Sequence, residues 1–343
     1  MKVFHSEKHR LRDTKTELSG GLLVPPFECP ERVAHIRAEL ARREYDDLSE
    51  PEDRGMEPIL RVHDAGYVGF LQSAWQEWVA AGYEGEAIPT CYPSRRMTRA
   101  RPPRDIDGRL GYYCLASETS ISDGTWEAAY WAAQTALAGA AAIRGGERSA
   151  FALCRPPGHH AAQDMYGGYC FLNNAAIAAQ ALRDAGAARV TVLDVDFHHG
   201  NGTQAIFYDR ADVQFLSLHG DPEDAFPHYL GGEDETGEGD GAGFTRNWAL
   251  PVGCSAERWF AALGEALGEV AAYAPDALVV SLGVDTFARD PISFFTLEAD
   301  DFTAMGARLA GAGLPTLFVM EGGYAVAEIG VNTVNVLEGF EGA

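Results

Sequence analysis

The sequence predicts an α/β protein in which a single doubly wound parallel sheet is flanked by helices on both faces. Short apolar, β-branched runs bounded by Gly, Pro or Asp are typical of buried parallel strands. Ala-rich segments with helical periodicity alternate with these runs, as in repeated strand–helix units. The strands are expected near residues 149–155, 190–194, 213–218, 277–282 and 315–320, and the helices at 124–144, 173–185, 256–272 and 299–312.

The amino-terminal third is less regular. Residues 30–43 and 65–81 have helical patterns, whereas residues 82–119 contain Pro, Gly and Arg with little periodicity. A stretch of that length without regular structure in a compact domain usually carries a function or is disordered. We therefore expect one domain spanning residues 1–343, with an inserted loop at about 82–119.

Composition limits the partners of the chain. Its 343 residues carry 27 basic and 50 acidic side chains, a formal net charge of −23. This charge repels nucleic acid and anionic lipid and is compatible with a cationic substrate. The chain has no apolar run of about 18 residues and no signal-peptide pattern at its amino terminus, so we expect no membrane span and a cytoplasmic location.

Five short motifs carry the chemical information. Each falls at or just after the carboxyl end of an expected strand, where open α/β sheets place their binding sites. We therefore expect the motifs to form one shared site. They are RPPGHH (155–160), DVDFHHGNG (194–202), SLH (217–219), GVD (283–285) and EGGY (321–324).

The second motif indicates a metal site. Asp196 and His198 are two residues apart, so an extended strand end directs both side chains the same way. Asp285 would be a third ligand, leaving positions open for water and substrate as catalysis requires. This ligand set suits Zn²⁺ or Fe²⁺, and an arginase-like two-manganese site would need more Asp and His ligands. The alternative role for such strand-end aspartates is helix capping.

Residues around this site can supply acid–base chemistry. His159 and His160 are adjacent, and one of them can act as general base to water and then as acid to a leaving amine. Asp194 can orient one imidazole and Asn201 the other. Tyr324 follows two glycines and can donate a hydrogen bond to a developing oxyanion. The alternative role for this tyrosine is packing at a turn.

Other residues suggest a substrate channel. Tyr169 and Phe226 flank motif segments and are candidates for its aromatic walls, although isolated aromatics are usually core residues. The acidic residues between 105 and 123, Asp107 and Glu118 among them, can form an electrostatic mouth for cationic substrates. Their alternative role is an ordinary solvated loop surface.

Together the five motifs resemble the histone deacetylase superfamily, in order and spacing, from about residue 65 to residue 324. This resemblance implies the arginase-deacetylase fold. Within the superfamily the chain is most similar to the bacterial acetylpolyamine amidohydrolases. The similarity lies in the segments GYYCLASETSISDGTWEAAYWAAQ and MEGGYAVAEIGVNTVNVLEGFE and in the long loop that precedes the first of them.

The resemblance assigns roles to individual residues. His160 becomes the general base and acid, His159 with Asp194 its electrostatic partner, and Tyr324 the oxyanion-stabilising phenol. Arg32 falls where related enzymes place an arginine beside an inner channel. The resemblance makes Asp196, His198 and Asp285 the zinc ligands. It makes Tyr169, Phe226 and Gly168 the channel residues. The ligands of a structural potassium ion become Ser217, Leu218 and the backbone oxygens of Asp194, Asp196 and His198.

Polyamine-type members of the family dimerise through the inserted loop, which narrows the mouth of their active site. The resemblance places Asp107 and Glu118 where acidic residues recognise the distal amine, although the family pattern favours glutamate at the first position. Asn201 stands where many histone deacetylases have aspartate. A neutral side chain there leaves His160 less basic and easier to keep neutral near pH 7.

We therefore expect a zinc-dependent hydrolase that converts acetylputrescine, acetylcadaverine or acetylspermidine to free amine and acetate, acting as a homodimer. Fe²⁺ is the alternative metal. A protein or peptide lysine deacetylase is the nearest alternative function. An arginase-type hydrolase, an acylated-antibiotic deacylase and a non-catalytic sensor of acetylated amines are the others.

Overall fold

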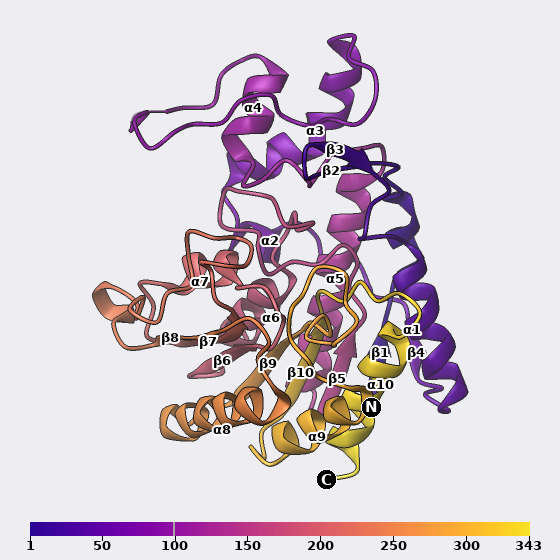
Figure 1. Ribbon diagram of the computed structural model, residues 1–343, viewed down its shortest axis with the longest axis vertical. Coiled ribbons are helices and arrows are strands. Elements are labelled where there is room, and N and C mark those ends of the chain that lie inside the picture. Colours follow the sequence, from indigo (N-terminus) through magenta and orange to yellow (C-terminus); the bar gives the residue numbers. More distant parts are fainter. Residues whose placement is uncertain (99) are drawn as a thin grey trace.

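The computed structural model describes residues 1–98 and 100–343, and a sheet of eight parallel strands lies at the centre of this part of the chain (Figure 1). The predicted fold class, one parallel sheet flanked by helices, is confirmed. The strands lie in the order β4 (Leu48–Ser49), β1 (Lys2–Phe4), β5 (Ser149–Ala152), β10 (Thr316–Met320), β9 (Ala277–Leu282), β6 (Val190–Asp194), β7 (Val213–Gly220) and β8 (Thr245–Leu250).

Both faces of the sheet are buried. Successive side chains of a strand point to opposite faces, and in β10 Leu317 and Val319 join one hydrophobic core while Phe318 and Met320 join another. This explains why the strands appear in the sequence as continuous apolar runs. The first core includes residues of α2 (Glu57–Leu60), α3 (Ala65–Ala80), α5 (Thr125–Arg144) and α6 (Asn174–Asp184), and the second residues of α1 (Glu31–Arg42), α8 (Ala256–Tyr273), α9 (Ala299–Ala310) and α10 (Ile329–Glu341).

Several helices begin at side-chain caps that satisfy their first backbone N–H groups. Asn173 accepts a hydrogen bond from the backbone N–H of Ala176 at the start of α6, over 2.9 Å. Ser255 accepts one from the N–H of Arg258 at the start of α8, over 3.3 Å. None of the helices in the described ranges is both long enough and apolar enough to span a bilayer.

The expectation that residues 82–119 form an irregular loop was wrong in one part, because this segment contains α4 (Ile106–Tyr113). Asp105 caps α4 and accepts hydrogen bonds from two backbone N–H groups, 3.0 and 3.3 Å away. The helix packs on α3, where the rings of Tyr113 and Phe70 stack 4.8 Å apart. Eight residues with two glycines carry little periodicity, so tertiary packing decides this helix rather than its own pattern.

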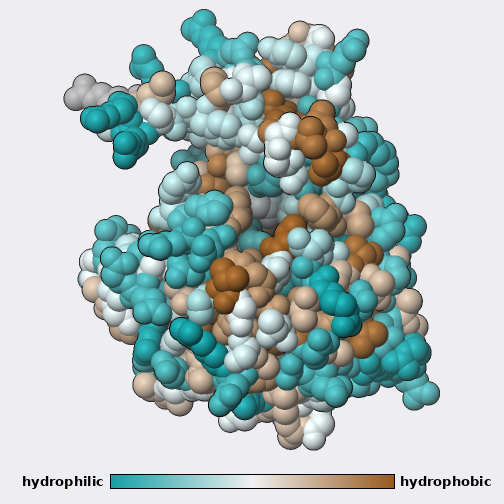
Figure 2. All heavy atoms as spheres, in the orientation of Figure 1, coloured by the Kyte–Doolittle hydropathy of each residue, from teal (hydrophilic) through white to brown (hydrophobic). Residues whose placement is uncertain are grey.

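The region of α3 and α4 projects from one end of the molecule (Figure 1). An antiparallel hairpin of β2 (Glu17–Ser19) and β3 (Leu22–Val24) also belongs to this end. In the same orientation, Figure 2 shows that the surface is hollowed beneath the projecting region.

Candidate active site

The five motifs meet at the carboxyl edge of five neighbouring strands. RPPGHH follows β5, EGGY follows β10, GVD follows β9, DVDFHHGNG begins within β6, and SLH ends β7. These strands adjoin one another in the order β5, β10, β9, β6, β7. Segments that are far apart in sequence therefore place their polar side chains around one point.

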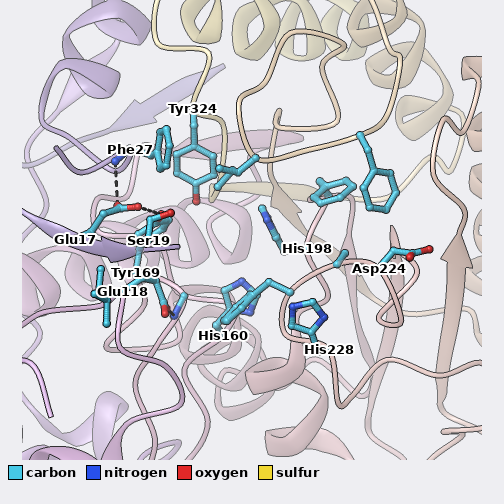
Figure 3. Close-up of a pocket in the computed structure, with 17 residues that line it drawn as sticks. Glu17, Ser19, Phe27, Glu118, His160, Tyr169, His198, Asp224, His228 and Tyr324 are labelled. Atoms are coloured by element: carbon cyan, nitrogen blue, oxygen red, sulfur yellow. Dashed lines mark hydrogen bonds between the residues drawn. The ribbon is translucent and has the colours of Figure 1, made fainter. Parts of the chain in front are cut away.

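A cavity of about 270 Å³ opens at this point (Figure 3). His160, His198 and Tyr324 together line one part of it, with the hydroxyl of Tyr324 directed into the space between them. Its lining is otherwise largely aromatic and acidic. The remaining lining residues are Glu17, Leu18, Ser19, Phe27, Glu118, Gly168, Tyr169, Phe197, Asp224, Ala225, Phe226, His228, Ile292 and Phe294.

Three predicted metal ligands converge beside the cavity. One ligand atom each from Asp196, His198 and Asp285 lies within 4.8 Å of the other two, and Asp196 and Asp285 are fully buried. The Nδ1 atom of His198 lies 3.2 Å from Asp196 Oδ1 and 3.0 Å from Asp285 Oδ2. Two carboxylate oxygens and one imidazole nitrogen form a donor set that fits a zinc-type ion.

Backbone groups hold the outer oxygens of this cluster. The N–H of Gly322 donates to Asp196 Oδ2 over 2.8 Å, and the N–H of Phe197 donates to Asp285 Oδ1 over 2.8 Å. These bonds direct the other oxygen of each carboxylate toward His198. A Cβ at Gly322 would lie 2.4 Å from Asp285 and 2.6 Å from Asp196, so only glycine lets this backbone approach the cluster.

His159 pairs with a buried carboxylate. Its Nδ1 atom lies 3.0 Å from Asp194 Oδ2, and its Nε2 atom lies 3.8 Å from Asp196 Oδ1. Burial opposes protonation of this imidazole, but the charges of Asp196 and Asp194 outweigh it and raise the pKa of His159 to about 10. The two carboxylates therefore favour the cationic form of His159, which an electrostatic partner requires.

His160 has the opposite electrostatic environment. Its Nδ1 atom lies 2.7 Å from Asn201 Oδ1, and its ring stands 4.0 Å from that of His159. Burial, together with the neighbouring His159 and His198, holds the pKa of His160 well below its usual value. A neutral imidazole with one free nitrogen is competent as a general base.

Tyr324 is fixed through its backbone. Its N–H donates to Asp290 Oδ2 over 2.6 Å, and Arg32 donates to the carbonyls of Gly323 and Glu321 over 2.7 and 2.5 Å. The guanidinium of Arg32 also lies 5.0 Å from the centre of the Tyr324 ring. Burial raises the pKa of Tyr324 well above its usual value, so its hydroxyl stays protonated and able to donate.

Both predicted aromatic walls line the cavity. The ring of Tyr169 lies 5.5 Å from that of Tyr324, and Phe226 meets the ring of His160 edge-on at 5.0 Å. Gly168, at the same wall, has a φ of +55°, and a Cβ there would lie 2.1 Å from His160 Cδ2. Glycine is therefore required at this position for both the backbone and the imidazole.

The two predicted acidic residues lie in different places. Glu118 lines the cavity, where its Oε1 atom accepts the N–H of Gly168 over 2.9 Å. Asp107 does not line it, because its carboxylate accepts the N–H of Thr90 over 3.0 Å and contacts the Thr90 hydroxyl. Within a single chain, Asp107 is therefore directed into its own loop.

The predicted potassium ligands lie beside the metal cluster, at the ends of two paired strands. Ser217 in β7 pairs with Asp194 in β6. The Ser217 hydroxyl lies 2.8 Å from Nδ1 of His219, and Leu218 is fully buried. The potassium site itself stays a prediction.

Three residues of the site were not predicted from the sequence. Glu17, in β2, accepts the Tyr169 hydroxyl over 3.2 Å and lines the cavity (Figure 3). Glu321 accepts the N–H groups of Gly158 and His159 over 2.6 and 3.2 Å, and Asp290 holds Tyr324. The carboxylate within the EGGY motif was a signal for Glu321, whereas nothing in the local pattern singles out Glu17 or Asp290.

Comparison with known proteins matches this chain along almost its whole length. Residues 26–340 match the model of the histone deacetylase domain. The chain is 57% identical over 342 residues to the acetylpolyamine amidohydrolase of Mycoplana ramosa, covering 100% of both chains. It is 54% identical over 340 residues to acetylpolyamine amidohydrolase 1 of Pseudomonas aeruginosa, covering 99% of this chain and 98% of the relative. The crystal structure of acetylpolyamine aminohydrolase from Burkholderia pseudomallei superposes with a TM-score of 0.94 at 41% identity, covering 99% of this chain and 98% of that one.

Proposed function

Because this chain belongs to the histone deacetylase family, we propose that it is a zinc-dependent deacetylase of small acetylated polyamines, such as acetylputrescine, acetylcadaverine and acetylspermidine. The observation that carries this proposal is the set of residues that line the cavity. One part of the cavity presents His160, His198 and Tyr324, and its lining includes the carboxylates of Glu17 and Glu118. The first set suits amide hydrolysis, and the carboxylates suit a cationic amine.

The family implies a metal cofactor, and Asp196, His198 and Asp285 would hold it. A bound zinc ion supplies Lewis-acid polarisation of the amide carbonyl and lowers the pKa of water. Fe²⁺ is the alternative for the same ligands, and metal analysis of the purified protein separates the two. We keep potassium as a prediction for the neighbouring Ser217 and Leu218.

The chain's own residues account for the proton transfers. The neutral His160 takes a proton from the attacking water at Nε2, because its Nδ1 faces Asn201. The same nitrogen then protonates the leaving amine. Tyr324 donates a hydrogen bond to the oxyanion, and the cationic His159 stabilises the developing negative charge. The products are the free polyamine and acetate.

The acidic lining can recognise the distal ammonium of a polyamine. One oxygen of Glu118 accepts backbone and side-chain hydrogen bonds, and its Oε2 atom remains for a ligand. Both oxygens of Glu17 have partners, from Phe27 and Tyr169, so Glu17 contributes mainly charge. Carboxylates that line the cavity complement the distal ammonium of a free acetylated amine, and this favours the polyamine function over a peptide deacetylase.

A pair of matched substrates tests this proposal. N-Pentylacetamide has the same length as acetylputrescine and carries a methyl group in place of the distal ammonium. We expect kcat/KM for acetylputrescine to exceed that for the amide at least tenfold, about 1.4 kcal/mol of transition-state discrimination. Equal values would show that the ammonium is not recognised.

Glu118→Gln keeps the hydrogen-bond acceptor of this side chain and removes its charge. The substituted enzyme should lose most of the preference for acetylputrescine while its kcat/KM for the uncharged amide is unchanged. Glu233→Gln is the matched control, because it removes one charge from an exposed glutamate that does not line the cavity. If Glu118→Gln kept the full preference for acetylputrescine, Glu118 would not be part of the recognition site.

We also propose that two chains pair through the end of the molecule that carries the inserted loop at 82–119 and the β2–β3 hairpin. Leu22 and Leu23 of the β2–β3 hairpin are 69% and 63% exposed, and Figure 2 shows apolar side chains gathered at that end. Exposed apolar groups of this kind commonly mark an interface. Light scattering tests the pairing. We expect the mass of a dimer for the wild type and a lower mass for the double variant Leu22→Asp, Leu23→Asp. A monomeric wild-type chain would contradict it.

A further inference from the structure

A second group of side chains that could bind a metal lies away from the active site. It is formed where the chain leaves strand β1. His5 directly follows β1, and Glu7 and His9 belong to the short 3-10 helix η1 (Glu7–Leu11). One ligand atom from each lies within 4.8 Å of the other two. Ser6 caps η1 by accepting the N–H of Lys8 over 3.3 Å, which fixes the turn that brings the three side chains together.

The two imidazoles of this group are buried and have no partners. His5 and His9 are 5% and 4% exposed. In the described part of the chain, neither nitrogen of either ring has a hydrogen-bond partner within 3.5 Å, and the backbone of Leu153 makes only a longer contact with His5. Buried polar groups are normally satisfied, so four such nitrogens in two adjacent rings require an explanation. The Glu7 side chain is about half exposed, at 49%, so the group is open to ions from solvent.

Both imidazoles are in the protonation state that binds metal. Burial and the charge of Arg155 lower the pKa of His9 to about 3, and burial and the charge of Arg37 lower the pKa of His5. Both are therefore neutral at pH 7, and no proton must be displaced from their nitrogens. Zinc therefore has no proton to displace at these nitrogens, although the burial and the charges of Arg155 and Arg37 that lower the two pKa values also act against a dication.

The surrounding charges partly oppose and partly favour a cation. Arg10 Nε lies 2.9 Å from Glu7 Oε2, and Arg37 contacts Glu7 Oε1. Glu50 adds a second carboxylate, which accepts the Glu7 N–H over 3.4 Å. The side chain of Arg37 is 35% exposed, so it can turn into solvent when Glu7 changes partner. The net charge of −23 further favours cation binding by the molecule as a whole.

We propose that His5, Glu7 and His9 bind a second zinc ion, separate from the catalytic metal. Two imidazoles and one carboxylate are a common zinc ligand set, and water completes a tetrahedral site. Ligand atoms around tetrahedral zinc lie ~3.3 Å apart, closer than the present spread. Glu7 Oε1 lies 3.7 Å from His5 Nε2, so a small rotation of the exposed Glu7 side chain brings these two atoms to that spacing. Binding would also draw the ligand atom of His9, which lies within 4.8 Å of both, toward them.

This site would brace the amino-terminal segment against the catalytic motifs. The carbonyl of His9 accepts a hydrogen bond from Nη1 of Arg155 over 2.7 Å, and Arg155 begins the RPPGHH motif. The ion would hold the end of β1 to η1 and thereby fix that carbonyl. Its role is structural, since no residue of the site lines the active-site cavity.

Metal stoichiometry tests the proposal. The full-length protein is stripped with a chelator, dialysed against micromolar free Zn²⁺ and measured by mass spectrometry of the metal. We expect two zinc ions per chain for the wild type, and one for each of His5→Gln, His9→Gln and Glu7→Gln. Deacetylation by these three variants should persist, which also shows that they fold. Asp285→Ala should hold one zinc ion, and Asp285→Ala with His9→Gln none.

His35→Gln is the matched control, because this histidine of α1 is exposed and outside the group. It should keep two zinc ions. One zinc ion in the wild type would overturn the proposal, as would two ions in all three variants of the group, which would place the second ion elsewhere. Glu7→Gln changes an exposed side chain, so its result stands even if a histidine variant does not fold. Failure of the proposed deacetylation would leave the zinc count unaffected, so the two proposals fail independently.

Discussion

The Nδ1 atom of His160 lies 2.7 Å from the Oδ1 atom of Asn201. The amide nitrogen of Asn201 donates to the backbone carbonyl of His160 over 3.3 Å, which fixes the orientation of the amide. Since Oδ1 can only accept, Nδ1 of His160 must carry the proton. The free lone pair is then on Nε2, so this contact decides which nitrogen acts as the base.

Replacing Asn201 by Asp should change the pH dependence of the reaction. The pKa of His160 is held low by burial and by the neighbouring His159 and His198, with no carboxylate at its Nδ1. An aspartate there would stabilise the protonated imidazole and raise its pKa. Because the protonated form cannot act as base, the acidic limb of kcat/KM should move to higher pH. If the acidic limb of kcat/KM stayed at the same pH, protonation of His160 would not be what determines it.

Replacing Tyr324 by Phe should abolish most of the catalysis and leave metal binding intact. The hydroxyl is directed into the cavity beside His160 and His198 but is not among the converging ligand atoms. Loss of one oxyanion donor lowers kcat on the order of 100- to 1,000-fold. Steady-state kinetics beside metal analysis measure both effects. Full kcat in the variant would refute the oxyanion assignment.

Replacing Asp285 by Ala should remove the metal. The Oδ2 atom of Asp285 lies 3.0 Å from His198 Nδ1, and its other oxygen accepts the Phe197 N–H. Loss of a direct ligand should weaken metal affinity by more than the roughly 10- to 100-fold typical of outer-shell changes. Competition with a chromogenic chelator gives the affinity. Wild-type affinity in Asp285→Ala would exclude this residue from the ligand set.

Replacing Gly168 by Ala should displace His160. The added Cβ would lie 2.1 Å from the imidazole, and a displacement of about 1 Å at a catalytic group lowers rate roughly 100-fold. Gly239→Ala is the matched control, since Gly239 also has a φ of +55° but no atom within 4 Å of the new Cβ. Both glycines have the same positive φ, so equal activities of the two variants would show that contact with His160 is unimportant.

Much of the fold was predictable because parallel strands buried on both faces leave a strong apolar signal. Val190–Asp194 and Ala277–Leu282 were predicted with their observed bounds. β1 has three residues and β4 two, too few for a pattern, and β8 (Thr245–Leu250) mixes Arg, Asn and Trp. The formation of α4 depends on its packing against α3, and the formation of α10 on its packing against α1 and α9.

The inner part of the candidate site was predictable because its residues follow strand ends, whose positions the sheet dictates. The grouping of Asp196, His198 and Asp285 could be predicted because the carboxyl ends of parallel strands lie at the same edge of the sheet. The outer part was not, because Glu17 comes from a three-residue strand in an irregular segment. Asp107 shows the same limit, since its contact with Thr90 depends on how residues 82–119 fold.

The relative rates on two substrate classes test the central proposal most directly. The measurement is kcat/KM of the zinc-loaded protein for acetylputrescine beside that for an acetyllysine peptide. A cavity with Glu17 and Glu118 in its lining predicts at least a tenfold preference for the free acetylated amine. A preference for the peptide would contradict the polyamine function and identify the chain as a lysine deacetylase.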